Sequence, residues 1–237
     1  MHAIRGIAAA VFCLAMLAPA QAQQSVPPVP SDAPLKRPIT AADIVTPPGL
    51  PSIGKWMVAR DGTIAHWLGG FYEGKHLREP VNVILVDTAA TSPEDAKQRL
   101  IAAASAAGYP VRFGHSTGYR ALIGGELYDQ LPAGRDDAFS NRIFELSNNH
   151  GRLFGPHPTG HGYVSIGAFS REDIRPFRWP EHGYASFNQA RDDFARNLDR
   201  HTAFKSDASV DLANAIAGDP EISTGDHDGR AVVLRAR

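Results

Sequence analysis

Hydrophobic and polar positions alternate with two different periods along the chain, which predicts both strands and helices. Residues 81–86 read VNVILV, a β-branched run typical of a strand that is buried on both faces. Apolar residues at helical spacing follow it, between Ser92, which suits an N-cap, and Gly108, which suits a left-handed C-cap. The pattern therefore predicts a buried strand followed by an amphipathic helix that packs on it.

The rest of the chain gives shorter signals. The Asp61-Gly62 pair between two apolar runs predicts a hairpin, and the Ser147-Asn148-Asn149 turn predicts another. A second helix is predicted over 188–201 and a weaker third over 210–217. Further strands are predicted at 111–113, 119–123, 139–146, 151–154, 163–169 and 230–234. We therefore expect a single α/β domain over 53–237, with a mixed β-sheet and two or three helices.

The first 52 residues follow another pattern. Residues 1–22 carry one cationic side chain, Arg5, then an uncharged apolar run, and end in Ala20-Gln21-Ala22, as a cleavable signal peptide does. The run is shorter than the about 20 residues of a membrane-spanning helix, so we expect a periplasmic or secreted protein with no transmembrane segment after cleavage. Residues 23–52 hold eight of the 18 prolines, which predicts a disordered tether.

Composition limits the kinds of functional site that the chain can hold. The single cysteine, Cys13, lies in the predicted signal peptide, so the mature chain is expected to have no disulfide, thiolate nucleophile or cysteine metal ligand. A net charge of −1 with 43% hydrophobic residues indicates a globular domain without bulk attraction to nucleic acid. Nothing in the composition indicates a cofactor.

Three histidines, His150, His157 and His161, lie close together in the sequence, but their spacing does not favour a metal site. Pro158 and Gly160 disfavour the helix that would place His157 and His161 on one face. We therefore predict ordinary loop histidines and no bound metal.

Residues 114–118 read GHSTG and match G-x-S-x-G, the nucleophile turn of α/β-hydrolases. In such an enzyme Ser116 would be the nucleophile and His227 the base, with Asp173 or Asp219 completing a triad. A glycine-rich turn capped by Ser116 explains the same residues, and Gly124-Gly125 interrupts the helix that should follow. A serine esterase is therefore an alternative hypothesis.

Charged and histidine side chains gather at the ends of the predicted elements. Because such ends meet at a crevice of an α/β sheet, these groups could form one site for a phosphate or carboxylate. A structural network of ion pairs is an equally good interpretation. The candidate catalytic groups are His150, His182 and Asp173, and the candidate ligand-binding groups are Arg152, Arg171 and Arg191.

The order of several short motifs resembles the LssY C-terminal domain family over about residues 78–237. The resemblance implies that His150, Arg152, Asp173, His182 and Arg191 share a site, and it implies no particular activity. Asn149 stands where the family has the first histidine of a His-His-x-Arg-aromatic motif. The motifs are VNVILV (81–86), AAGY (106–109), NHGRLF (149–154), VSIGAFSRED (164–173), ARDDF (190–194) and DGRAVVL (228–234).

Three functional hypotheses follow. The leading one is an exported accessory or binding protein whose polar crevice binds an anionic small molecule or an envelope component. The alternatives are the serine esterase with Ser116, and a phosphoester hydrolase that uses His150 or His182 as general acid or nucleophile. Binding and catalysis both stay open at this point.

Overall fold

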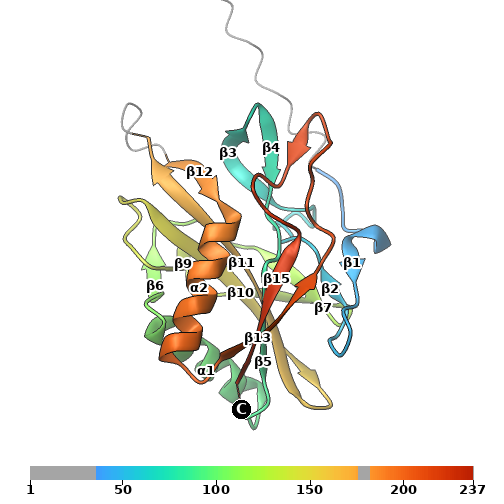
Figure 1. Cartoon of the computed structure of the whole chain (residues 1–237), viewed down its shortest axis with the longest axis vertical. Helices are drawn as coiled ribbons and strands as arrows, with labels where there is room; N and C mark the ends of the chain where they lie inside the picture. The colour runs from blue at the N-terminus through green and yellow to red at the C-terminus, as the bar shows by residue number, and fades with distance from the viewer. Residues whose placement is uncertain (1–35, 176–181, 237) are drawn as a thin grey trace, which may run out of the picture. The chain divides into compact units, whose positions relative to one another are not determined.

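The computed structural model describes residues 36–175 and 182–236 and shows a β-rich fold (Figure 1). Strands account for 45% and helices for 17%, and one mixed sheet holds twelve strands. The prediction of an α/β fold is therefore wrong. The short alternating segments between 111 and 174 belong to an antiparallel arrangement and are not interleaved with helices. The predicted signal peptide and residues 23–35 of the predicted tether lie outside the described residues.

The elements follow one another along the described chain with only two α-helices among many strands. They are η1 (a 3-10 helix, Ala41–Asp43), β1 (Ile44–Val45), β2 (Ile53–Gly54), β3 (His66–Tyr72), β4 (Lys75–Arg78), β5 (Val83–Asp87), α1 (Pro93–Ala106), β6 (Val111–Phe113), β7 (Arg120–Ile123), β8 (Glu126–Leu131), β9 (Asp137–Ser140), β10 (Asn148–Thr159), β11 (Gly162–Ile174), β12 (His182–Ser186), α2 (Phe187–His201), β13 (Lys205–Asp211), β14 (Ile222–Ser223) and β15 (Arg230–Ala236).

The large sheet is built around the long β10–β11 hairpin. Its order is β1-β2-β7-β8-β10-β11-β5-β15-β13, with β12 paired to β11, β9 paired to β10 and β6 paired to β9. Strand β5 is antiparallel to β11 and parallel to β15. A smaller sheet has the order β14-β4-β3.

Strand β5 is buried on both faces, as predicted, because two different layers cover it. Val83 and Leu85 belong to a core cluster shared with both α-helices. Ile84 and Val86 point to the other face and pack in a second cluster with Ile53 of β2 and residues of β7. The sheet thus curls so that its own early strands cover the face that lacks helices, which explains why a doubly buried strand occurs in a β-rich fold.

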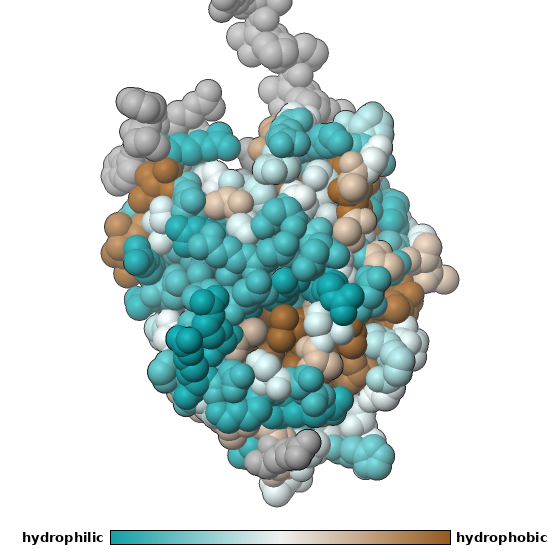
Figure 2. Space-filling model, viewed as in Figure 1, coloured by the Kyte–Doolittle hydropathy of each residue, from teal (hydrophilic) through white to brown (hydrophobic). Residues whose placement is uncertain are grey.

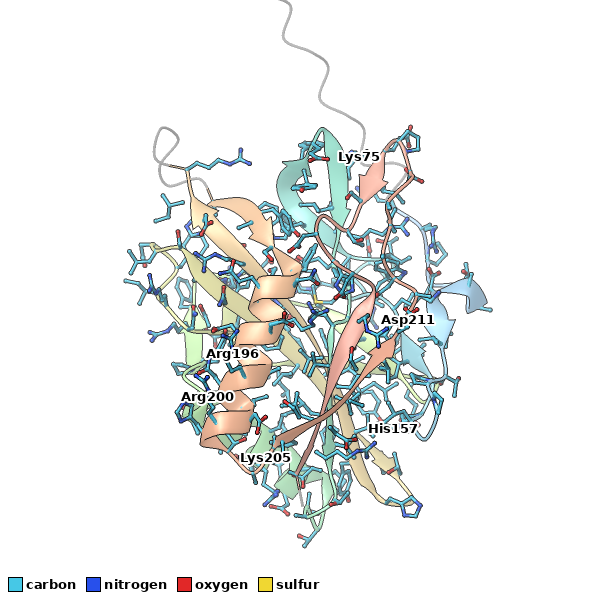
Figure 3. All side chains as sticks on the ribbon, viewed as in Figure 1. Lys75, His157, Arg196, Arg200, Lys205 and Asp211 are labelled. Carbon is cyan, nitrogen blue, oxygen red and sulfur yellow. The ribbon has the colours of Figure 1, made fainter. Side chains whose placement is uncertain are left out.

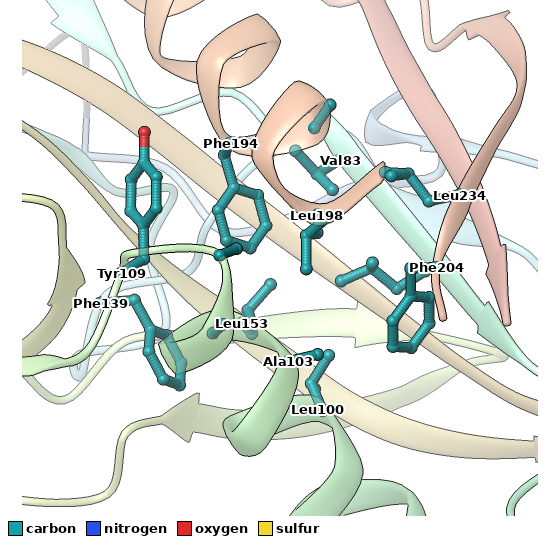
Figure 4. Packing of buried hydrophobic residues seen from close by; sticks show 14 of the residues in the cluster. Val83, Leu100, Ala103, Tyr109, Phe139, Leu153, Phe194, Leu198, Phe204 and Leu234 are labelled. Carbon is teal, nitrogen blue, oxygen red and sulfur yellow. The ribbon is translucent and has the colours of Figure 1, made fainter. Parts of the chain in front are cut away.

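The two helices cover one face of the sheet (Figure 1). The outer surface over α2 is mainly hydrophilic (Figure 2), and Arg196 and Arg200 on this helix are exposed (Figure 3). Phe194 and Leu198 on its inner side pack against Leu153 of β10 (Figure 4). Neither helix in the described ranges is long and apolar enough to cross a membrane.

Local sequence signals predicted the bounds of α1 and α2 closely. The Ser92 hydroxyl accepts a hydrogen bond from the Asp95 backbone N–H at 3.1 Å, and Gly108 has a φ of +81° beyond the end of α1. Helix α2 begins one residue before its predicted start and ends at His201 as predicted. The predicted hairpin at Asp61-Gly62 is also confirmed, since Val58 and Ile64 form an antiparallel bridge around it.

Two local predictions are wrong because pairing in the sheet overrides turn and helix signals. Asn148 and Asn149 do not form a turn; they begin β10, where Asn148 lies opposite Glu172 of β11. The predicted third helix, 210–217, is instead the end of β13, which pairs with β15, followed by a loop.

The described part of the proline-rich segment packs against the domain. Residues 36–52 include η1 and β1, and Asp43 in η1 is 3% exposed. Its carboxylate lies 2.6 Å from Arg37 and accepts a hydrogen bond from the Trp56 indole N–H at 3.0 Å. From residue 36 onward, this segment is therefore held by buried polar contacts, in place of the extended tether expected up to residue 52.

Candidate functional site

A cavity of about 290 Å³ lies where both sheets meet the loops after β6 and β9. The β10–β11 hairpin, β3 and β12 contribute residues to its lining, and so do the loops after β4, β6 and β9. The lining residues are Trp67, Leu68, Glu79, His115, Ser116, Phe144, His150, Arg152, Glu172 and His182.

Strand register explains which residues reach this cavity. His150 and Arg152 are two apart on β10, so their side chains point to the same face of the sheet. His150 lies opposite Ser170 on β11, which places Glu172 on that face as well. In the pairing of β11 with β12, His182 lies opposite Ile174. Ile174 is two residues from Glu172, so His182 lies on the face that carries Glu172. Three strands, β10, β11 and β12, therefore present one polar cluster.

Glu172 joins two of the histidines. Its Oε2 lies 2.9 Å from His182 Nδ1, and its Oε1 lies 3.5 Å from His150 Nε2. The Asn148 amide nitrogen donates to the Leu146 carbonyl, so its oxygen accepts from His150 Nδ1 at 3.0 Å. This tautomer leaves a lone pair on His150 Nε2 facing the carboxyl group. A protonated Glu172 would donate a hydrogen bond to this lone pair.

Burial controls the protonation of the cluster. It lowers the pKa of His115 to about 3, with Arg152 and His182 adding to the effect, and it holds the pKa of His150 well below its usual value. Burial likewise lowers the pKa of His182. It raises the pKa values of Glu79 and Glu172 to about 7, against the opposing effect of the Arg152 charge. The imidazoles are therefore neutral at neutral pH, and the carboxyl groups lie near half-protonation.

Arg152 is the cation of the cavity and is 2% exposed. Its Nη2 donates to the Ser116 carbonyl at 2.8 Å and lies 3.3 Å from the Ser116 hydroxyl, and its guanidinium lies 5.1 Å from the centre of the Tyr119 ring. Its Nε is buried and has no hydrogen-bond partner within the described residues. No carboxylate among those residues forms an ion pair with it. Arg152 thus has one buried N–H donor that no described group satisfies.

Aromatic rings close the rest of the cavity. Phe144 stacks on His182 with ring centres 4.3 Å apart and meets His115 edge-on at 5.5 Å. His115 in turn stacks on His150 at 4.4 Å. The Nε2 of His115, like Arg152 Nε, is buried without a hydrogen-bond partner in the described structure. The site therefore combines unpaired polar atoms with an apolar wall.

The residues singled out from the sequence divide between this cavity and other places. His150, Arg152, His182 and Ser116 line the cavity. Arg171 and Asp173 alternate with Glu172 on β11 and pair with each other at 2.8 Å instead. Three more lie in separate contacts outside the cavity: Arg191 is 2.6 Å from Asp228, His227 bonds Asn214 at 2.8 Å, and Asp219 accepts a hydrogen bond from the Glu221 backbone N–H at 2.8 Å.

Three important residues of the cavity were not singled out from the sequence: Glu79, His115 and Glu172. For Glu172 a signal existed, because strand alternation in Ser170-Arg171-Glu172-Asp173 separates Glu172 from its charged neighbours. Glu79 follows β4 and His115 follows β6, and only the tertiary fold brings them to β10.

No group of three or more histidine, cysteine, aspartate or glutamate side chains in the described ranges is placed to hold a metal ion. His157 lies toward the end of the β10–β11 hairpin (Figure 3), where its Nδ1 is 2.9 Å from the Tyr128 hydroxyl. His161 is exposed at the turn of this hairpin. Neither contributes to the cavity.

The G-x-S-x-G segment forms a loop between two strands, β6 and β7, and no helix follows it. Gly114 and Gly118 have φ values of +107° and +92°, which suit glycine. The Ser116 hydroxyl is 2.9 Å from the Tyr119 hydroxyl and 3.3 Å from Arg152 Nη2. It therefore makes its hydrogen bonds to groups that cannot act as a general base at neutral pH.

This geometry predicts that Ser116 does not react as an esterase nucleophile. After incubation with a fluorophosphonate probe, the purified chain should show no labelling on a fluorescence gel, because among the described residues the Ser116 hydroxyl hydrogen-bonds Tyr119 and Arg152 and no imidazole. Ser116→Ala serves as the control. Labelling of the native chain that disappears in this variant would contradict the prediction.

Comparisons with family models, characterised proteins and solved structures gave no match for this chain.

Proposed function

We propose that this cavity binds a small anionic ligand, a phosphate ester or a carboxylate, through Arg152. The observation that carries the proposal is the buried guanidinium of Arg152, a residue that lines the cavity and whose Nε has no hydrogen-bond partner within the described residues. A buried cation without an ion-pair partner is costly, and an anion placed against it would recover that cost. On this proposal the chain is an exported accessory or binding protein whose ligand is an anionic small molecule or an envelope component.

The two glutamates fit an anion when they carry protons. As a carboxylic acid, Glu79 would donate a hydrogen bond to the ligand, and Glu172 would donate to His150 Nε2 and carry no charge toward the ligand; as carboxylates, both would repel it. Their pKa values, which burial raises to about 7, place this change near neutral pH. Binding of an anion should raise these pKa values further, so binding is coupled to proton uptake.

The proposal predicts that affinity falls as pH rises. Acetate and methanesulfonate are suitable probes because their charge hardly changes between about pH 6 and about pH 8. We expect the affinity for both to fall over this interval on the order of tenfold for each glutamate that must be protonated. Isothermal titration calorimetry measures the dissociation constants, and proton uptake follows from repeating it in buffers of different ionisation enthalpy.

Equal affinity at both pH values would contradict the role of the glutamates. Absence of binding across acetate, methanesulfonate and methyl phosphate at the lower pH would contradict the proposed function itself.

A second candidate function is phosphoester hydrolysis, which the contact of Glu172 with both histidines favours. Glu172 lies between His182 Nδ1 and His150 Nε2, so this group could deliver a proton to a leaving oxygen near Arg152. If the site only binds, the native chain should release p-nitrophenolate from p-nitrophenyl phosphate no faster than His150→Ala does. Turnover by the native chain that falls at least tenfold in both His150→Ala and Glu172→Gln would assign catalysis to the site.

A further inference from the structure

Large hydrophobic side chains stand exposed on segments that also supply lining residues to the cavity. We call four of them the apolar rim: Leu68, which is 61% exposed, Phe113 at 72%, Ile143 at 49% and Leu146 at 46%. Leu68 itself lines the cavity, and so does Phe144, which lies within the turn that joins Ile143 to Leu146. The rim is thus continuous with the wall of the polar site.

Phe113, the last residue of β6, lies at the same place. Gly114 lies so close to Phe144 that a Cβ at position 114 would come within 2.7 Å of the Phe144 Cβ. Glycine at a φ of +107° permits this contact, which holds Phe113 beside the Phe144 turn. Figure 2 shows hydrophobic surface at the left edge of the view, beside β9 and β12. Exposed apolar groups gathered at one place indicate a contact surface.

The cavity is too small to take a long apolar group as well as a polar head. Its volume of about 290 Å³ lies at the lower end of the range for small-molecule sites. Polar groups on β10, β11 and β12 line it, and the exposed hydrophobic residues are Leu68, which lines it too, and neighbours of the lining residues His115 and Phe144. An anionic head in the interior would therefore direct the remainder of the ligand across the rim.

We infer that the ligand is a single-chain amphiphile, with an anionic phosphate or carboxylate head in the cavity and an alkyl chain on the apolar rim. The inference rests on the proposed function, because Arg152 fixes the head. It adds the chemical class of the ligand, since a small hydrophilic anion would leave the rim without a role. Burial of each methylene against the rim would strengthen binding by hydrophobic transfer.

The test is a series of methyl, butyl and octyl phosphate, titrated below their micelle concentrations at one pH by isothermal titration calorimetry. We expect affinity to rise about twofold to fourfold per methylene, the upper figure corresponding to full burial of each group. Phe113→Ser and Ile143→Ser should reduce this dependence on chain length and leave the affinity for methyl phosphate unchanged. Leu127→Ser is the matched control, because Leu127 is 47% exposed on β8 and does not line the cavity.

The outcomes separate the two proposals. If methyl phosphate does not bind, the proposed function fails. If methyl phosphate binds and octyl phosphate binds no more tightly, the proposed function survives and the amphiphile inference is overturned. The inference is also overturned if Leu127→Ser lowers the chain-length dependence as much as Phe113→Ser does. A ligand-free dimer in sedimentation velocity that Phe113→Ser dissociates would assign the rim to self-association instead.

Discussion

Replacing Arg152 by methionine is expected to weaken binding of methyl phosphate by about a hundredfold or more. The change removes the buried guanidinium of a residue that lines the cavity, whose Nε has no hydrogen-bond partner in the described part of the chain. Methionine has a similar length and keeps the packing against Tyr119, so the loss would reflect charge and hydrogen bonding rather than a cavity. Arg152→Lys should bind with intermediate affinity, since it keeps the charge and loses the planar donor group.

The matched control is Arg171→Met on the same hairpin. Arg171 faces away from the cavity and pairs with Asp173, so methyl phosphate should bind this variant as it binds the native chain. Titration calorimetry of the three variants at about pH 6 gives the comparison. Unchanged binding in Arg152→Met, or an equal loss in Arg171→Met, would show that the anion does not bind at Arg152.

Replacing Glu172 by glutamine is expected to stabilise the protein at alkaline pH. Burial raises the pKa of Glu172 from 4.5 to about 7, so the folded state holds this proton more tightly than the unfolded state does. Its contribution to stability is therefore full below about pH 4.5 and is lost as pH rises toward 7 and above. Glutamine does not ionise and avoids this loss, which amounts to about 3 kcal/mol for a shift of this size.

Urea unfolding at about pH 5 and about pH 8 tests this expectation. The free energy of unfolding of Glu172→Gln should exceed that of the native chain mainly at the higher pH. The buried neutral histidines have depressed pKa values and act in the opposite direction, but they are present in both proteins and cancel in the difference. Glu126→Gln, with a side chain 70% exposed, should show no such gain. A Glu172→Gln effect that is equal at both pH values would contradict a buried, proton-retaining glutamate.

Local sequence signals predicted the helices and failed for the long strands. Helix α1 has its cap at Ser92 and a breaker at Gly108, so a short window of sequence suffices to predict it. Strand β10 contains Gly151, Gly155 and Pro156, which locally indicate turns, yet its pairing with β11 runs from Asn148 to Thr159 with one irregularity after Phe154. The α/β prediction failed because this pairing is a tertiary property.

The candidate site was predictable to the extent that strand alternation determines it. His150 and Arg152 lie together because they are two residues apart on one strand. The same rule separates Arg171 and Asp173 from them, and it applies only once the limits of β10 and β11 are known. Glu79 and His115 come from distant segments, and nothing in their local sequence connects them to the hairpin.

The resemblance to the LssY C-terminal domain implied a shared site for five residues. Three of them, His150, Arg152 and His182, line the cavity. Asp173 and Arg191 make ion pairs outside it, with Arg171 and Asp228 respectively. Asp173 and Arg191 thus fit the interpretation of a structural ion-pair network. A ligand site is proposed for His150, Arg152 and His182.

The most direct test of the anion site is an NMR titration with octyl phosphate that follows the nitrogen and proton resonances of the Arg152 Nε–H group. The signal is assigned by its disappearance in Arg152→Lys. We predict a large, saturable downfield shift of this one signal, because its buried N–H gains a charged acceptor. If octyl phosphate binds and the Arg152 signal stays in place while other arginine signals move, the ligand lies elsewhere and the account is wrong.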